Sequence, residues 1–240
     1  MRLNVRSWGT GARTAVLVHG FSDDSQTWWQ VAPAIADLGF TVLAPDLRGH
    51  GLSPRGDSYA LADFAADLVE TLPAGVDLLL GHSLGALAVG VAAPHLSPRR
   101  AVFVDPPWLR SSGQLALLRA LPTTPDELPA HWSAEDVAVD LRSNAQVDPA
   151  VAPALVAELT ALQLVPVPPL PVAGSVVLTP ELDPALPLEA HASIREAGYG
   201  LLVQPGVAHV MHRDDLDGFL GLLRPLLVAE GAAASPVGAC

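Results

Sequence analysis

Short apolar runs alternate along this chain with longer segments in which apolar and polar residues recur at helical spacing. The short runs are continuously apolar, which is typical of strands covered by helices on both faces. Repeated strand–helix units predict an α/β fold with a mostly parallel sheet of about seven to eight strands and helices on both faces. We expect strands at residues 3–8, 14–20, 40–46, 76–81, 99–105, 175–179 and 199–204, and helices at 27–39, 61–72, 83–93, 188–197 and 214–230.

The alternation stops between residues 106 and 171, where we predict no strand. Two helix starts are expected inside this segment. Ser133 opens the stretch "SAED", which resembles a capping box, and Asp148 is followed by proline at the first helical position. The segment ends in "PVPPLP", which favours a stiff extended chain. We therefore expect a core of residues 1–105 and 172–230, a small helical insertion at 106–171, and a disordered tail at 231–240.

The composition narrows the class of protein. Hydrophobic residues make up 50% of the 240 positions, which indicates a well-buried core. The formal net charge of −12 argues against a nucleic-acid partner, because phosphate binding needs a basic face. No apolar stretch reaches the roughly 18 residues that cross a bilayer, and no signal-peptide run opens the sequence. We expect a cytoplasmic protein without a membrane partner.

Residue types also limit the chemistry. All 13 basic residues are arginines, which excludes a lysine Schiff base. The only cysteine is the last residue, Cys240, so we expect no disulfide, no cysteine metal site and no cysteine nucleophile. No metal and no organic cofactor is predicted. The expected partner is a small-molecule substrate, and a homodimer is compatible with the sequence.

The stretch "LLLGHSLGAL", residues 78–87, places one serine at the joint between a predicted strand and a predicted helix. Its "GHSLG" matches G-x-S-x-G in the strand–turn–helix context that this motif requires. Gly81 and Gly85 leave room for a tight turn, Ser83 is forced into a strained conformation, and the next helix points its N-terminus at the hydroxyl. A serine that only caps a helix is the alternative, and the context favours a nucleophile.

A serine nucleophile needs a base and a carboxylate that orients the base. We predict His209 as the base, because it lies in "PGVAHVMHRDD" between the last strand and the last helix. His212 is one turn further on, where an ordinary surface position is the alternative. His82 adjoins the serine, but its side chain is expected to point away from the hydroxyl.

The carboxylate has three candidates. Asp183 follows a predicted strand in "VVLTPELDPAL", at the sheet edge where such folds place functional residues, and it is the preferred one. Glu181 lies two residues earlier and is a substitute. Asp105 is the serious rival, since it also ends a strand, in "VFVDPPW". The preferred chain order is Ser83, Asp183, His209.

Four stretches, in this order, resemble the α/β-hydrolase fold family: "VLVHGFSDDSQTW", "LAPDLRGHGLS", "GHSLGA" and "AHVMHRDD". The resemblance covers residues 14–230 and implies a serine hydrolase with Ser83, Asp183 and His209 as its catalytic residues. It also implies an oxyanion hole formed by the backbone N–H groups of Phe21 and Leu84, and a lid formed by the insertion.

Two departures from the family pattern are visible. Only one strand-like stretch precedes the "HG" strand where two are usual, so the sheet is expected to have as few as seven strands. Ala208 stands where the family's histidine loop usually has glycine, which is expected to tighten the loop without removing the base.

The expected reaction is hydrolysis of a carboxylic ester or lactone through an acyl-enzyme. Alternatives on the same fold are C–C bond hydrolysis, hydroxynitrile lysis and cofactor-free perhydrolysis, or a non-catalytic ligand-binding role. A serine at position 83 argues against epoxide hydrolase and haloalkane dehalogenase chemistry, for which relatives use a carboxylate nucleophile. Trp28, Trp108 and Trp132 are candidates to line the pocket, and the substrate is expected to be small, apolar and uncharged.

Overall fold

The computed structural model describes residues 1–109, 124–162, 166–168, 172–182 and 185–228. The strands are β1 (Val5–Trp8), β2 (Arg13–Val18), β3 (Phe40–Pro45), β4 (Leu78–His82), β5 (Ala101–Val104), β6 (Val176–Pro180) and β7 (Gly200–Gln204). The α-helices are α1 (Val31–Ala36), α2 (Leu61–Thr71), α3 (Leu84–Leu96), α4 (Ala134–Gln146), α5 (Val151–Ala161), α6 (His191–Glu196), α7 (Met211–Asp214) and α8 (Leu216–Val228). Short 3-10 helices are η1 (Ser25–Trp28), η3 (Pro125–Glu127) and η4 (Leu188–Ala190). The expected tail at 231–240 lies outside the described residues.

The seven strands form one sheet in the order β1-β3-β2-β4-β5-β6-β7. Strand β1 runs antiparallel to β3, and every other pair is parallel. Both the mostly parallel α/β sheet and its seven strands confirm the prediction. Because β4 and β5 are neighbours and parallel, the residues that follow them, Ser83 and Asp105, emerge side by side at the carboxyl edge of the sheet.

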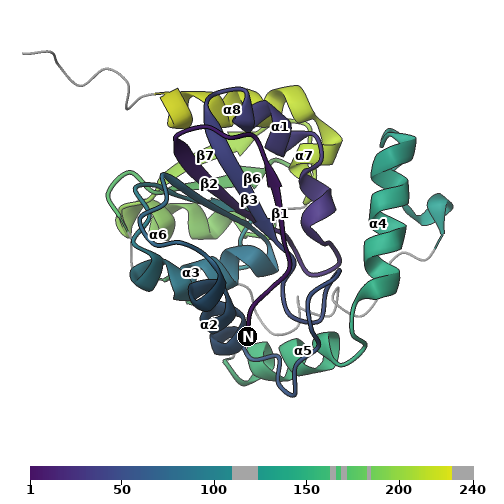
Figure 1. The fold of residues 1–240 in the computed structure, drawn as a ribbon. Helices are drawn as coiled ribbons and strands as arrows, with labels where there is room; N and C mark the ends of the chain where they lie inside the picture. Colours follow the sequence, from purple (N-terminus) through teal and green to yellow (C-terminus); the bar gives the residue numbers. More distant parts are fainter. Residues whose placement is uncertain (110–123, 163–165, 169–171, 183–184, 229–240) are drawn as a thin grey trace, which may run out of the picture.

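Helices cover both faces of the sheet. One face packs against α1 and α8, and the other against α2, α3 and α6 (Figure 1). Successive side chains of β2 point to opposite faces of the sheet: Ala15 and Leu17 face one core, whereas Val16 and Val18 face the other. All four side chains are fully buried, which explains the continuous apolar run in the sequence.

The segment between β5 and β6 carries the helices α4 and α5, as the sequence predicts. Ser133 caps α4 by accepting a hydrogen bond from the backbone N–H of Asp136 at 3.1 Å. Asp148 opens the turn before α5, but the helix itself begins only at Val151. Helix α5 packs into the core through Leu155 and Leu159, whereas α4 stands at the side of the molecule (Figure 1).

The helix expected at 27–39 is the 3-10 helix η1 followed by the short α1. Pro33 lacks the N–H that would bond to the carbonyl of Trp29, which weakens a continuous helix at this point. The helix expected at 214–230 is α8, which begins at Leu216 because Asp215 before it has extended backbone (φ −152°, ψ 94°).

Candidate active site

Ser83 occupies the strained joint that the motif predicts. Its backbone has φ 51° and ψ −114°, a left-handed region that non-glycine residues rarely adopt. A side chain at Gly81 would place its Cβ 2.5 Å from the carbonyl oxygen of Gly85, and a Cβ at Gly85 would overlap the backbone of Val18 and His19. The two glycines therefore allow β4 and α3 to meet closely enough to hold this turn.

Two backbone N–H groups are available beside the serine. In the part of the chain that the structure describes, neither Phe21 nor Leu84 donates its backbone N–H to any acceptor. Leu84 is the first residue of α3, and Phe21 follows Gly20, where an added Cβ would lie 3.4 Å from the Cβ of Ser83. Free N–H groups at this position, one of them at a helix N-terminus, favour a developing negative charge.

His209 pairs with Asp105. The Nδ1 atom of His209 lies 2.5 Å from Oδ2 of Asp105, whose carboxylate is fully buried, whereas the side chain of His209 is 39% exposed. The same carboxylate accepts backbone N–H groups of Ala185 at 2.8 Å and of Leu186 at 3.2 Å. A buried carboxylate held in this way fixes Nδ1 as the bonded nitrogen and orients the ring.

The carboxylate that bonds to His209 in the described residues is the rival candidate, Asp105, and not the preferred candidate, Asp183. Asp183 lies outside the described residues, but the loop after it contributes the N–H groups of Ala185 and Leu186 to Asp105. The physical reason is the strand order: Asp105 follows β5, which is the direct neighbour of β4 and of Ser83. Its backbone φ of 40° marks it as a strained position like Ser83. Glu181 instead accepts the backbone N–H of Gly206 at the surface.

The other two histidines considered from the sequence, His82 and His212, are both buried. The ring of His82 lies against the ring of His209, with centroids 4.8 Å apart, and its Nε2 donates to the carbonyl oxygen of His209 at 3.0 Å. Burial, together with the nearby His209, lowers the pKa of His82 to about 4, so the ring stays neutral near neutral pH. His212 is buried rather than at the surface: it bonds to Thr27 Oγ1 at 2.9 Å, and burial holds its pKa well below the ordinary value.

Two residues missed by the sequence analysis steady the histidine loop. Asp214 accepts the backbone N–H of Ala208 at 2.7 Å and the indole N–H of Trp132 at 2.7 Å. Arg213 is buried beside it and is paired with two carboxylates. The stretch "HRDD" could have pointed to these two residues, since charged side chains directly after His212 would be unexpected in an ordinary core helix.

The three tryptophans do not share one environment. Trp28 is fully buried in the core, where its ring centroid lies 4.6 Å from that of His212. Trp108 is 1% exposed and packs against Phe103 and Tyr199. Both rings are buried among other side chains, and their place at a pocket wall stays a prediction. Trp132 is half-buried, and its place at a pocket wall stays a prediction.

A membrane-spanning helix and a metal-binding cluster are both absent from the described residues. No helix in them is long and apolar enough to span a membrane. The same residues contain no cluster of three histidine, cysteine or acidic side chains that would suit a metal ion.

Known proteins resemble the chain in sequence and in fold. The epoxide hydrolase A of Mycobacterium tuberculosis is 40% identical over 96 residues, 37% of this chain and 30% of the relative. The 2-(acetamidomethylene)succinate hydrolase of Mesorhizobium japonicum is 40% identical over 88 residues, 35% of this chain and 31% of the relative. The matched segments thus span about a third of these two relatives.

Similarity in fold extends further. The crystal structure of the enol-lactonase from Burkholderia xenovorans LB400 matches with a TM-score of 0.75 at 19% identity, over 95% of this chain and 96% of that one. The family model described as "Alpha/beta hydrolase family" matches residues 15–222. With the seven-stranded sheet and the serine joint in place, the chain belongs to the α/β-hydrolase family.

Proposed function

We propose that this protein is a serine hydrolase that cleaves a carboxylic ester or lactone through an acyl-enzyme. The observation that carries the proposal is the hydrogen bond between His209 and Asp105 at the same sheet edge as the strained Ser83. In this proposal Ser83 is the nucleophile, His209 the base and Asp105 the orienting carboxylate. A serine at position 83 argues against the epoxide chemistry named for one relative.

The proposed reaction follows from these positions. His209 takes the proton of Ser83 as the oxygen attacks the substrate carbonyl, and Asp105 stabilises the imidazolium. The N–H groups of Phe21 and Leu84 bind the oxyanion, a contribution of roughly 100- to 1000-fold in rate for each donor. His209 then protonates the leaving alcohol. Water attacks the acyl-enzyme by the same route and releases the acid and the free serine.

The segment 106–171 is proposed as a lid over this site. Helix α4 contacts η1 through Arg142 and Gln26, and it contacts α7 through Asp140 and Arg213. We propose a small, apolar and uncharged acyl group for the substrate. A preferred anionic substrate that depends on Arg142 would contradict this part of the proposal; Arg110 and Arg119, the other arginines in the segment, lie outside the described residues.

The experiment is release of p-nitrophenol from acetate, butyrate and octanoate esters by the wild type and by Ser83→Ala. The expected result is turnover by the wild type and a loss on the order of 10⁴- to 10⁶-fold in the variant. Ser97→Ala is a matched control, because Ser97 also has a left-handed backbone (φ 46°) but ends α3 away from the site. Equal turnover by Ser83→Ala and the wild type would overturn the proposal. Absence of turnover in the wild type would favour the lyase, C–C hydrolase or ligand-binding alternatives.

A further inference from the structure

Arg213 joins three separate segments inside the molecule. Its side chain is 1% exposed and comes from α7, directly after the histidine loop. The guanidinium donates to Asp140 of α4 at 2.6 Å and to Asp23 at 2.6 Å, and it also bonds to Thr27 at 3.0 Å. A planar donor with fixed geometry that holds two carboxylates from different segments sets the distance between those segments.

Asp23 closes the turn that contains Phe21. Its backbone N–H donates to the carbonyl of Gly20 at 3.4 Å, so residues 20–23 form a turn with Phe21 at its second position. Asp23 is 3% exposed, and its carboxylate is held by Arg213. The direction of the Phe21 N–H therefore depends on a turn whose last residue is fixed from outside.

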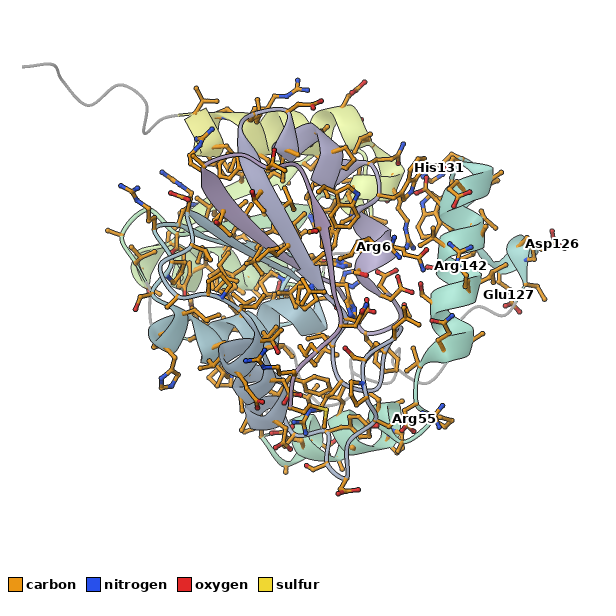
Figure 2. All side chains as sticks on the ribbon, viewed as in Figure 1. Arg6, Arg55, Asp126, Glu127, His131 and Arg142 are labelled. Carbon is orange, nitrogen blue, oxygen red and sulfur yellow. The ribbon has the colours of Figure 1, made fainter. Side chains whose placement is uncertain are left out.

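Helix α4 has little apolar surface to hold it in place. Its buried residues are Asp136, Val139, Asp140 and Ser143, of which one is apolar. Figure 2 shows the side of α4 that faces the core crowded with nitrogen and oxygen atoms, among them those of Arg142, whose guanidinium lies 3.3 Å from Gln26 Oε1. The docking of α4 consequently rests on polar contacts, which hold only when their partners are in register.

We propose that Arg213 is a positioning residue that couples the docking of α4 to the placement of the Phe21 N–H. The inference rests on the proposed function only where it assigns an oxyanion to Phe21; the mechanical coupling stands on the contacts alone. When α4 is docked, Asp140 and Asp23 share one guanidinium and the turn 20–23 is fixed. When α4 is released, Arg213 still bonds to Asp23 but loses its bond to Asp140. The turn of residues 20–23 then becomes more mobile.

The pair of variants Asp140→Ala and Asp140→Asn tests the coupling. Alanine removes the acceptor of Arg213, whereas asparagine keeps an acceptor oxygen. Burial, reinforced by the carboxylate of Asp23, raises the pKa of Asp140 to about 6. The carboxylate is therefore the main form at pH 8, and asparagine tests the acceptor oxygen without the charge. Asp136→Ala is the matched control, since it removes a second buried carboxylate of α4 that bonds to Trp29 and does not touch Arg213.

The first readout is backbone hydrogen exchange of the full chain without substrate. Asp140→Ala is expected to accelerate exchange about tenfold both in α4 and in the peptide that contains residues 20–23. Asp140→Asn is expected to leave that peptide at the wild-type rate, and Asp136→Ala to accelerate α4 alone. Faster exchange confined to α4 in Asp140→Ala, or the same acceleration of the turn in all three variants, would overturn the proposal.

The second readout is ester turnover, measured only after the wild type has shown activity. Asp140→Ala is expected to lower kcat by about 10- to 100-fold with little change in KM, because a misplaced oxyanion donor weakens the transition state more than the ground state. Asp140→Asn is expected to restore kcat. An unchanged kcat in a folded Asp140→Ala variant would overturn the inference and leave the serine hydrolase proposal intact, whereas inactivity of the wild type would remove only the proposed function.

Discussion

The carboxyl edge of the sheet and helix α4 are held in place by different forces. At the sheet edge, Ser83 and Asp105 follow strands whose residues are all buried, and their strained backbones are fixed by close packing of the main chain. Helix α4, by contrast, turns Asp136 and Asp140 inward and is bound through an indole and a guanidinium. The first arrangement is stabilised mainly by apolar burial, and the second by directional polar contacts.

Because of this difference, the two regions suit different proposed roles. Apolar packing tolerates little displacement, which suits the groups proposed to do the chemistry. Polar contacts between a helix and a core exchange more readily with water, which suits an element proposed to open and close over substrate. Variants that alter one region and spare the other test whether the tasks are really separate.

The largest expected effect lies at the sheet edge. Asp105→Asn is expected to lower kcat for p-nitrophenyl esters by about 10⁴-fold, because asparagine no longer holds the useful tautomer of His209. Asp183→Asn is the matched control and is expected to retain near wild-type activity, since Asp105 already occupies Nδ1 of His209. The opposite ranking of the two variants would restore Asp183 as the orienting carboxylate.

The next largest effect is expected on the free energy of unfolding, because the main chain is closely packed behind Ser83. Gly85→Ala is expected to lower the free energy of unfolding by about 1–3 kcal/mol or more, because its Cβ overlaps backbone carbonyl oxygens that cannot rotate away. Gly221→Ala, in α8, is the control with nothing within 4 Å of the added Cβ, and it is expected to stabilise by about 0.5–1 kcal/mol. Denaturant unfolding measures both, and destabilisation of equal size would contradict the packing argument.

Buried histidines predict acid sensitivity of the core. Burial, together with the neighbouring His19, lowers the pKa of His50 to about 4, so the native state stays unprotonated where the unfolded chain binds a proton. Stability from His50 is present above the unfolded value of about 6.5 and is lost as the pH falls toward 4, which amounts to about 2 kcal/mol between pH 7 and 5. His50→Asn is expected to flatten the pH dependence of unfolding, whereas His95→Asn, an exposed position, is expected to leave it unchanged.

Helix α4 is expected to respond to pH with the opposite sign and to a smaller extent. The pKa of Asp140 is raised to about 6, so its contribution to stability is present at low pH and is lost as the pH rises through that value. Asp140→Asn removes this dependence and is therefore expected to stabilise the protein more at pH 8 than at pH 5. A variant whose advantage grew on acidification would show that the carboxylate is stabilised by Arg213 more than burial penalises it.

The fold and the turn at Ser83 were predictable because both are recorded in local sequence patterns. Continuous apolar runs report strands buried on both faces, and the glycines around Ser83 report a turn that admits no side chain. Which carboxylate bonds to His209 was not predictable. It depends on which strand lies next to β4, and sequence order does not give strand order. The burial of His212 and the pairing of Arg213 with Asp140 also depend on contacts between distant segments.

The most direct test of the central claim is covalent labelling of Ser83 by a p-nitrophenyl alkylphosphonate, followed by peptide mass spectrometry. The phosphonate carries a charged oxygen like that of the tetrahedral intermediate and traps a serine that its base has activated. The account predicts one adduct, on the peptide with Ser83, no adduct in Ser83→Ala, and much slower labelling in His209→Gln. Ester turnover by a protein that is labelled at another residue, or that is labelled equally fast without His209, would contradict it.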